Sequence, residues 1–170
     1  MMKYPLTALS LALNVVIALL PFYWWSYGID GLIVIKDSPF QLYMNLLGQD
    51  LTIVEIVNLF LFAFRFYVIT VSSIYLIYLY KGVRKTYGTV YYLSYLYVLD
   101  PVILYLAFNY VLPFLGYSTS YPFFIIGKER MELSYSNAQI SATVFSYPTL
   151  AYWFSLASGI IYLASRVLKR

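Results

Sequence analysis

Two charged residues lie inside long apolar segments of this chain, and they are its clearest candidates for chemistry. Arg65 falls within the apolar run 53–80, and Asp100 falls within the run 89–115. Charge is costly inside a bilayer, so such residues are expected to be paired and often to be functional. Together they could form a gate, a proton-carrying site or an anchor for a quinone or lipid headgroup. They could equally form a static ion pair that fixes the alignment of two helices.

The spacing of the two residues predicts that they are partners. Arg65 and Asp100 each lie about 15 residues from the nearest inner charges, which is about 23 Å along a helix. A short loop would make the two helices antiparallel neighbours, at matching depth. Pro101 removes a backbone hydrogen bond directly after Asp100, and broken membrane helices commonly line polar cavities. We therefore expect an intramembrane ion pair beside a helix break.

The composition indicates which elements must position these residues. The 170 residues are 62% hydrophobic and 11% charged, whereas soluble domains carry about 25% charged residues. A bilayer requires about 20 apolar residues per helix. We therefore predict one all-α membrane domain, residues 1–170, built as a four-transmembrane-helix bundle. The predicted spans are residues 6–25, 53–80, 89–115 and 149–168.

The first span has a competing interpretation as a signal peptide. It lacks an A-x-A type cleavage site and ends in the bulky aromatic residues 22–25, which suit a membrane interface. These features favour a retained helix.

The charges predict the orientation. The termini and the inner loop 81–88 carry basic residues and no acidic ones, which places both termini in the cytoplasm. The basic residues are Lys3, Lys81, Arg84, Lys85, Arg166, Lys169 and Arg170. Acidic and basic residues are mixed in the outer loops 26–52 and 116–148. The expected location is therefore the cell membrane, as a multi-pass protein.

The outer loops also carry strand signals. Residues 32–35 form a short run rich in β-branched residues, and apolar and polar residues alternate over 131–136 and 140–144. A further strand could occupy residues 121–126. These patterns predict a small antiparallel β cap on the outer end of the bundle. Loose polar loops are the alternative.

Tyrosine is unusually abundant, at 21 residues of 170. Deep phenol groups need hydrogen-bond partners, so we expect a polar seam between helices. Its candidate members are Asn58, Tyr67, Tyr97 and Asn109. A redox or proton-conducting tyrosine chain is the alternative.

The last span carries small residues at four-residue spacing. Ala151, Ser155 and Gly159 form a helix-packing stripe that permits close helix approach. The stripe could face another span or another subunit.

Several kinds of site are excluded by residue types that the chain lacks. It contains no cysteine and no histidine, which excludes disulfides, thiolate metal sites, iron–sulfur clusters and bis-histidine haem. Nucleotide-binding, HExxH and GxSxG motifs are absent. We expect no catalytic residues, no metal and no cofactor. The net charge of +4 is explained by orientation, so the expected partners are the bilayer and membrane proteins, as other subunits or a homo-oligomer, and not nucleic acid.

The predicted outline resembles the claudin-like arrangement of four spans, cytoplasmic termini and an outer β cap. The paired cysteines of that family's first outer loop are absent, and the second outer loop is the longer one, so the resemblance concerns architecture. The leading hypothesis is a non-enzymatic protein that acts through protein contacts, as a cofactor-free subunit of a membrane complex or as an envelope or cell-contact component. The alternatives are an oligomeric transporter or channel gated at Arg65 and Asp100, and a quinone-interacting accessory subunit of a respiratory complex. The composition suits a thermophile.

Overall fold

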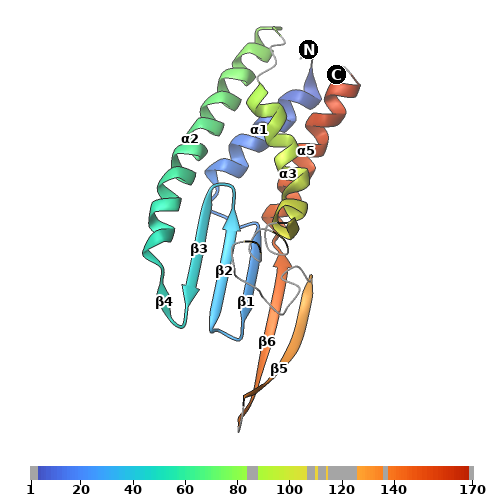
Figure 1. The fold of residues 1–170 in the computed structure, drawn as a ribbon. Coiled ribbons are helices and arrows are strands. Elements are labelled where there is room, and N and C mark those ends of the chain that lie inside the picture. The colour runs from blue at the N-terminus through green and yellow to red at the C-terminus, as the bar shows by residue number, and fades with distance from the viewer. Residues whose placement is uncertain are drawn as a thin grey trace.

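The computed structural model describes residues 4–83, 88–106, 110, 114, 126–135 and 138–168. Within these residues a layer of helices stands on one end of an antiparallel sheet (Figure 1). The helices are α1 (Pro5–Leu19), α2 (Thr52–Tyr80), α3 (Gly88–Leu106) and α5 (Leu150–Val167). The strands are β1 (Trp25–Ile29), β2 (Ile33–Ser38), β3 (Gln41–Leu46), β4 (Gln49–Asp50), β5 (Gly127–Tyr135) and β6 (Ala138–Pro148).

The prediction of an all-α four-transmembrane-helix bundle is wrong. The described residues include a six-stranded sheet in the order β4-β3-β2-β1-β6-β5. Among the helices of the described residues, α2 and α5 alone are long and apolar enough to cross a membrane. Helix α1 ends at Leu19, just before Pro21, and Trp25 begins a strand instead of closing a span. Helix α3 contains five tyrosines, and Asp100 and Pro101 lie within it.

The outer-loop strand predictions are confirmed in part. Strand β2 covers most of the predicted run, and β5 and β6 pair as an antiparallel hairpin. The candidate strand at 121–126 lies outside the described residues except for Ile126, which is in a bend. The sheet is larger than predicted because residues 25–50 fold into four consecutive strands.

The helices pack together around shared buried clusters to which α1, α2, α3 and α5 all contribute. Helix α1 lies between α2 and α5, and α3 packs against α5. The start of α1 and the end of α5 lie together at the end farthest from the sheet (Figure 1). Helix α2 ends in a Schellman-type turn, with Gly82 at φ +74° and the Val83 amide donating to the Tyr78 carbonyl.

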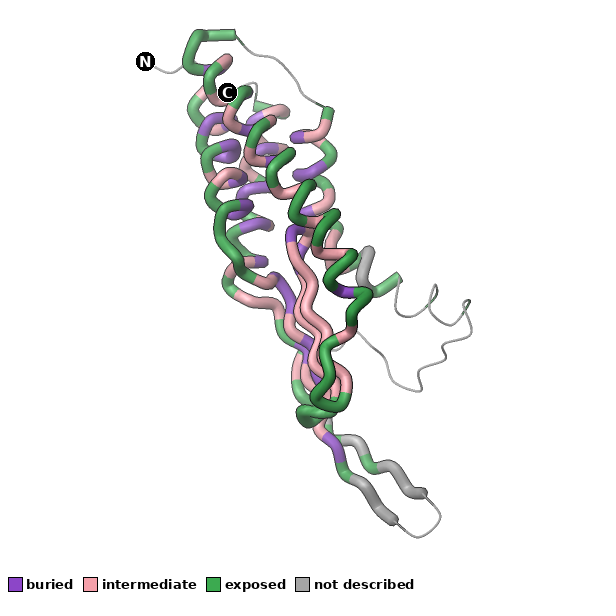
Figure 2. The backbone as a smooth tube through the Cα atoms, turned by 90° about the vertical axis from the view of Figure 1, so that its left-hand side faces the viewer, coloured by how far each residue is buried: buried purple, intermediate pink, exposed green. Residues whose placement is uncertain are grey.

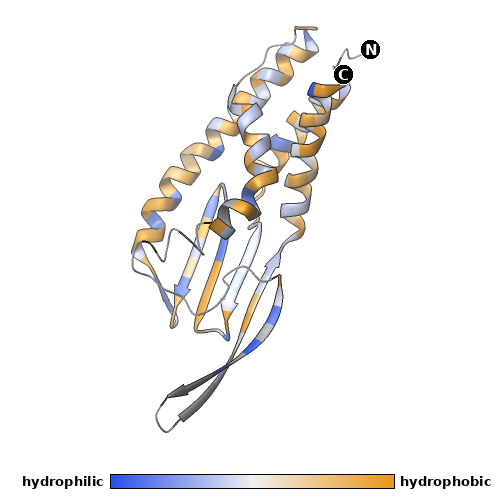
Figure 3. Ribbon diagram, turned by 45° about the vertical axis from the view of Figure 1, so that its right-hand side comes forward, coloured by the Kyte–Doolittle hydropathy of each residue, from blue (hydrophilic) through white to orange (hydrophobic). Residues whose placement is uncertain are grey.

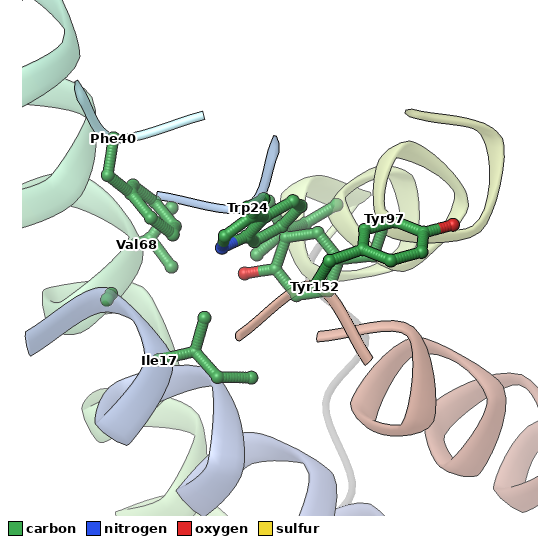
Figure 4. Packing of buried hydrophobic residues seen from close by; sticks show 8 residues of the cluster. Ile17, Trp24, Phe40, Val68, Tyr97 and Tyr152 are labelled. Atoms are coloured by element: carbon green, nitrogen blue, oxygen red, sulfur yellow. The ribbon is translucent and has the colours of Figure 1, made fainter. Parts of the chain in front are cut away.

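The main aromatic core lies where the helices meet the sheet (Figure 4). Trp24, at the entry to β1, contacts Tyr97 of α3 edge-to-face, with ring centroids 4.9 Å apart. It also contacts Phe40 at the tip of the β2–β3 hairpin, at 6.2 Å. Buried residues are concentrated among the helices and at this junction (Figure 2). The junction therefore joins the helical layer and the sheet into one packed unit.

Candidate functional site

Arg65 binds the tip of the β2–β3 hairpin. Its Nη2 donates to Gln41 Oε1 at 3.1 Å and to the Phe40 carbonyl at 3.4 Å. Within the described part of the chain it forms no ion pair with Asp100. The side chain that was predicted to join two helices instead joins a helix to the sheet.

Asn58 binds the same hairpin about two turns earlier on α2. Its Oδ1 accepts a hydrogen bond from the Leu42 amide, and its Nδ2 donates to the Leu42 carbonyl, both at 2.7 Å. A side-chain amide that pairs with both backbone groups of one residue takes the place of a neighbouring strand. Asn58 and Arg65 therefore form a clamp, here called the hairpin clamp, that fixes β3 against α2.

The hairpin tip is shaped by its own sequence. The Ser38 hydroxyl accepts hydrogen bonds from the Phe40 and Gln41 amides at 3.3 and 3.1 Å, as in a serine-capped turn. Pro39 occupies the turn between them. This geometry presents the Phe40 ring to the core and the Phe40 carbonyl to Arg65.

Asp100 interacts with Asp37 of β2 rather than with Arg65. Burial in the first place, and repulsion by the Asp100 carboxylate in the second, raise the pKa of Asp37 to about 7. Neither carboxylate has a basic partner among the described residues. Pro101 does not end α3, which continues as helix to Leu106. The junction therefore contains two acidic side chains without a counter-charge.

The other members of the predicted polar seam are dispersed. The Tyr67 hydroxyl lies 2.8 Å from Thr89 Oγ1 and links α2 to α3. The buried Tyr97 hydroxyl has no hydrogen-bond partner among the described residues. Asn109 lies outside the described residues. These residues do not form one continuous seam with Asn58.

A different polar seam, which sequence reasoning missed, runs between α1 and α5. The Thr7 hydroxyl donates to Ser165 Oγ at 3.1 Å, and Ser10 Oγ donates to the Ser158 carbonyl at 3.0 Å. Ser158 Oγ donates to Asn14 Oδ1 at 2.7 Å. All five residues are buried. The signal was present, since Thr7, Ser10 and Asn14 recur at helical spacing on one face of the first apolar run.

Gly159, one member of the small-residue stripe, packs within the chain against α3. A methyl group at Gly159 would lie 2.9 Å from the Ser94 carbonyl oxygen and 3.3 Å from Tyr97 Cβ. Ser155 uses its hydroxyl locally, donating to the Ala151 carbonyl at 2.8 Å. Gly159 therefore permits α3 and α5 to approach closely.

No protein-family model, curated protein or solved structure matches this chain. Among the described residues there is no group of three or more acidic side chains placed to hold a metal ion. Two of the predicted site residues, Asn58 and Arg65, are used to join α2 to the sheet. The features that bear on function are therefore the surfaces of the helices and the sheet.

Proposed function

We propose that this chain is a multi-pass membrane protein without catalytic activity, with both termini in the cytoplasm and the sheet outside. In this proposal the sheet binds other proteins, so that the chain serves as a subunit of a membrane complex or as an envelope or cell-contact component. The observation that carries the proposal is the exposed apolar surface of α2 beside a firmly attached sheet.

Helix α2 buries little of its apolar surface within the chain. Leu59 and Phe60 are 68% and 71% exposed, and Ile56 and Phe66 are also exposed. Apolar residues extend along most of α2 (Figure 3). Soluble monomers rarely expose a contiguous apolar surface of this extent. A bilayer is the solvent that such a helix requires.

The charges support the orientation. Lys81 ends α2 and Arg166 lies in the last turn of α5, both far from the sheet. Arg84 and Lys85 follow α2 directly in the sequence. Basic residues at one end of the helical layer favour the cytoplasmic side for that end. The sheet then faces the exterior.

Strand β5 supports a protein-contact role. It forms one edge of the sheet, is nine residues long, and presents the exposed side chains Lys128, Arg130 and Glu132. Edge strands offer backbone groups for pairing with another chain. Because the hairpin clamp attaches the sheet to α2, a partner bound at β5 would be held at a fixed height above the membrane. Arg65 already binds the hairpin tip, which favours a structural role for it over a gate.

Two measurements on the full chain test the proposal. Alkaline carbonate extraction of native membranes should leave the chain in the pellet, and purification in mild detergent should recover it in an assembly heavier than the 19.7 kDa monomer. Arg130→Glu, at the edge strand, should release the partner. Lys81→Glu, at the opposite end, is the matched charge reversal and should retain it. Recovery of a lone monomer under all these conditions would contradict the protein-contact role.

A further inference from the structure

A cavity of about 770 Å³ lies between the end of α1 and the start of α5. Its size falls within the range of about 300–1,000 Å³ that small-molecule sites occupy. We name it the α1–α5 groove. It borders the aromatic core, because Ile17 and Trp24 belong to that core and also line the groove.

The long walls of the α1–α5 groove are apolar. Val16 of α1 and Leu20, which directly follows α1, line it together with Leu150 and Phe154 of α5, and all four are exposed. The described chain does not cover these side chains. Such walls fit a hydrocarbon chain.

The end of the groove nearest the sheet is polar and basic. Ser26 and Lys36 lie directly opposite each other on β1 and β2, and both line the groove. Lys36 is the only charged residue among the described lining residues, and its ammonium group lies 6.0 Å from the centre of the Tyr43 ring. Tyr23 also lines this end and adds a phenol that can donate a hydrogen bond. An ammonium group, a hydroxyl and a phenol without any acid form a surface suited to an anion.

We propose that the α1–α5 groove binds one anionic phospholipid, with an acyl chain along the apolar walls and the headgroup phosphate at Lys36. A zwitterionic lipid would bring a second positive charge close to Lys36 along with its phosphate, and a free phosphate ion would leave the walls exposed. The inference rests on the proposed function, because the boundary between the helical layer and the sheet then lies at the level of the lipid headgroups. The bound lipid would be an integral part of the seam between α1, α5 and the sheet.

Native mass spectrometry of the full chain in detergent can test the headgroup site. The probes are dioleoyl phosphatidylglycerol and dioleoyl phosphatidylcholine, which share acyl chains and differ in headgroup charge. The wild-type chain should bind the anionic lipid about fivefold more tightly, the effect expected of one lysine near a headgroup. Lys36→Gln should abolish this preference. Lys128→Gln, on exposed β5, is the matched control and should keep it.

A second pair of variants tests the acyl site. Val16→Trp places a large ring in the groove and should weaken binding of both lipids about tenfold, as expected if the equivalent of about two methylene groups is displaced. Leu9→Trp is the control on the same helix, because Leu9 is 49% exposed and Val16 is 50% exposed, but Leu9 does not line the groove. The control variant should bind both lipids like the wild type.

Equal binding of the two lipids by the wild-type chain, or equal effects of the two tryptophan variants, would overturn the inference. These outcomes are distinct from failure of the proposed function. A chain that resists carbonate extraction but shows no lipid preference contradicts the groove alone. A chain released by carbonate contradicts both.

Discussion

Replacing Asp37 with asparagine should stabilise the protein at neutral pH. Burial and the Asp100 carboxylate raise the pKa of Asp37 from 3.8 to about 7. The folded state therefore disfavours the charged form of this side chain, whereas the unfolded chain does not. Asparagine has a similar shape and no charge, so it should remove that penalty while keeping the side chain in place.

The structure sets the size of the effect. A tenfold change in proton affinity corresponds to about 1.4 kcal/mol, so the shift of Asp37 is worth at most about 4 kcal/mol. Asp37 is partly exposed, and water that reaches it reduces this figure, so we expect about 2 kcal/mol. For a chain of this length that is an increase in the unfolding midpoint of about 4–8 °C.

The sign of the pH dependence follows from the direction of the shift. Below about pH 4 Asp37 is protonated in both states, and the wild-type stability is undiminished. As the pH rises from 4 to 7, the unfolded chain loses the proton and the folded chain retains it, so the free energy of unfolding of the wild type falls. Above about pH 7 the loss is complete. Asp37→Asn should therefore match the wild type at pH 4 and exceed it at pH 7.5.

Thermal unfolding in bicelles, followed by circular dichroism at both pH values, provides the assay. Glu132→Gln removes an exposed acid from β5 and controls for net charge. A variant that gains equal stability at pH 4 and 7.5, or a control that gains as much as Asp37→Asn, would refute the reasoning. In either case the buried acids at the junction between helices and sheet would not be the cause of the gain in stability.

Four further substitutions test the framework. Arg65→Met should lower the free energy of unfolding by about 2–3 kcal/mol, because it leaves the Phe40 carbonyl unsatisfied, and denaturant titration in detergent measures this. Asn58→Leu should cost about 2 kcal/mol in the same titration and should speed amide exchange in β3, since both bonds to Leu42 are lost. Gly159→Ala should cost about 1–3 kcal/mol and increase protease cleavage near α3, because the added methyl group meets Ser94. Asn14→Leu should lower the unfolding midpoint slightly, for a loss of about 1 kcal/mol, because Ser158 loses the shorter of its two hydrogen bonds and keeps the one to the Ser10 carbonyl.

Local sequence patterns predicted the strands in which apolar and polar residues alternate clearly. The β5–β6 hairpin follows from the polar and apolar alternation over 131–136 and 140–144, and β2 from its β-branched residues. Two further turn signals went unused. Gly31 and Gly48 both have positive φ, and they mark the turns that join β1 to β2 and β3 to β4. Together with these two glycines, the sequence of residues 25–50 predicts a series of antiparallel strands joined by short turns.

The first span was predicted too long because of its aromatic residues. Residues 22–25 are typical of a membrane interface, and this property hides the start of a strand. Trp24 and Trp25 are both buried, the first in the aromatic core and the second with its Nε1 donating to Ser146 Oγ at 2.7 Å. Ser146 is 121 residues away in the sequence. Only tertiary packing distinguishes a buried tryptophan from an interfacial one.

Helix geometry alone does not determine the partners of Arg65 and Asp100. Equal depth along two helices predicts that the two charges pair, but it leaves out the strands that reach the same depth. The tip of the β2–β3 hairpin lies at the depth of Arg65. Its Phe40 carbonyl requires a hydrogen-bond donor, and Arg65 supplies one. The position of the hairpin tip cannot be predicted from the helices alone, because it depends on the hydrogen bond by which Asn58 of α2 holds β3.

The raised pKa of Asp37 and the lack of an Arg65–Asp100 ion pair among the described residues have the same cause. Arg65 is committed to the hairpin tip, so neither acid at the junction gains a counter-charge, and their mutual repulsion adds to the cost of burial. If the guanidinium lay against Asp100 instead, the field at Asp37 would be partly cancelled and its pKa would fall back toward that of an ordinary carboxyl group. Arg65→Met should therefore leave the pH dependence of stability intact while lowering stability at every pH. Asp37→Asn should do the reverse, reducing the pH dependence and leaving the hairpin clamp in place.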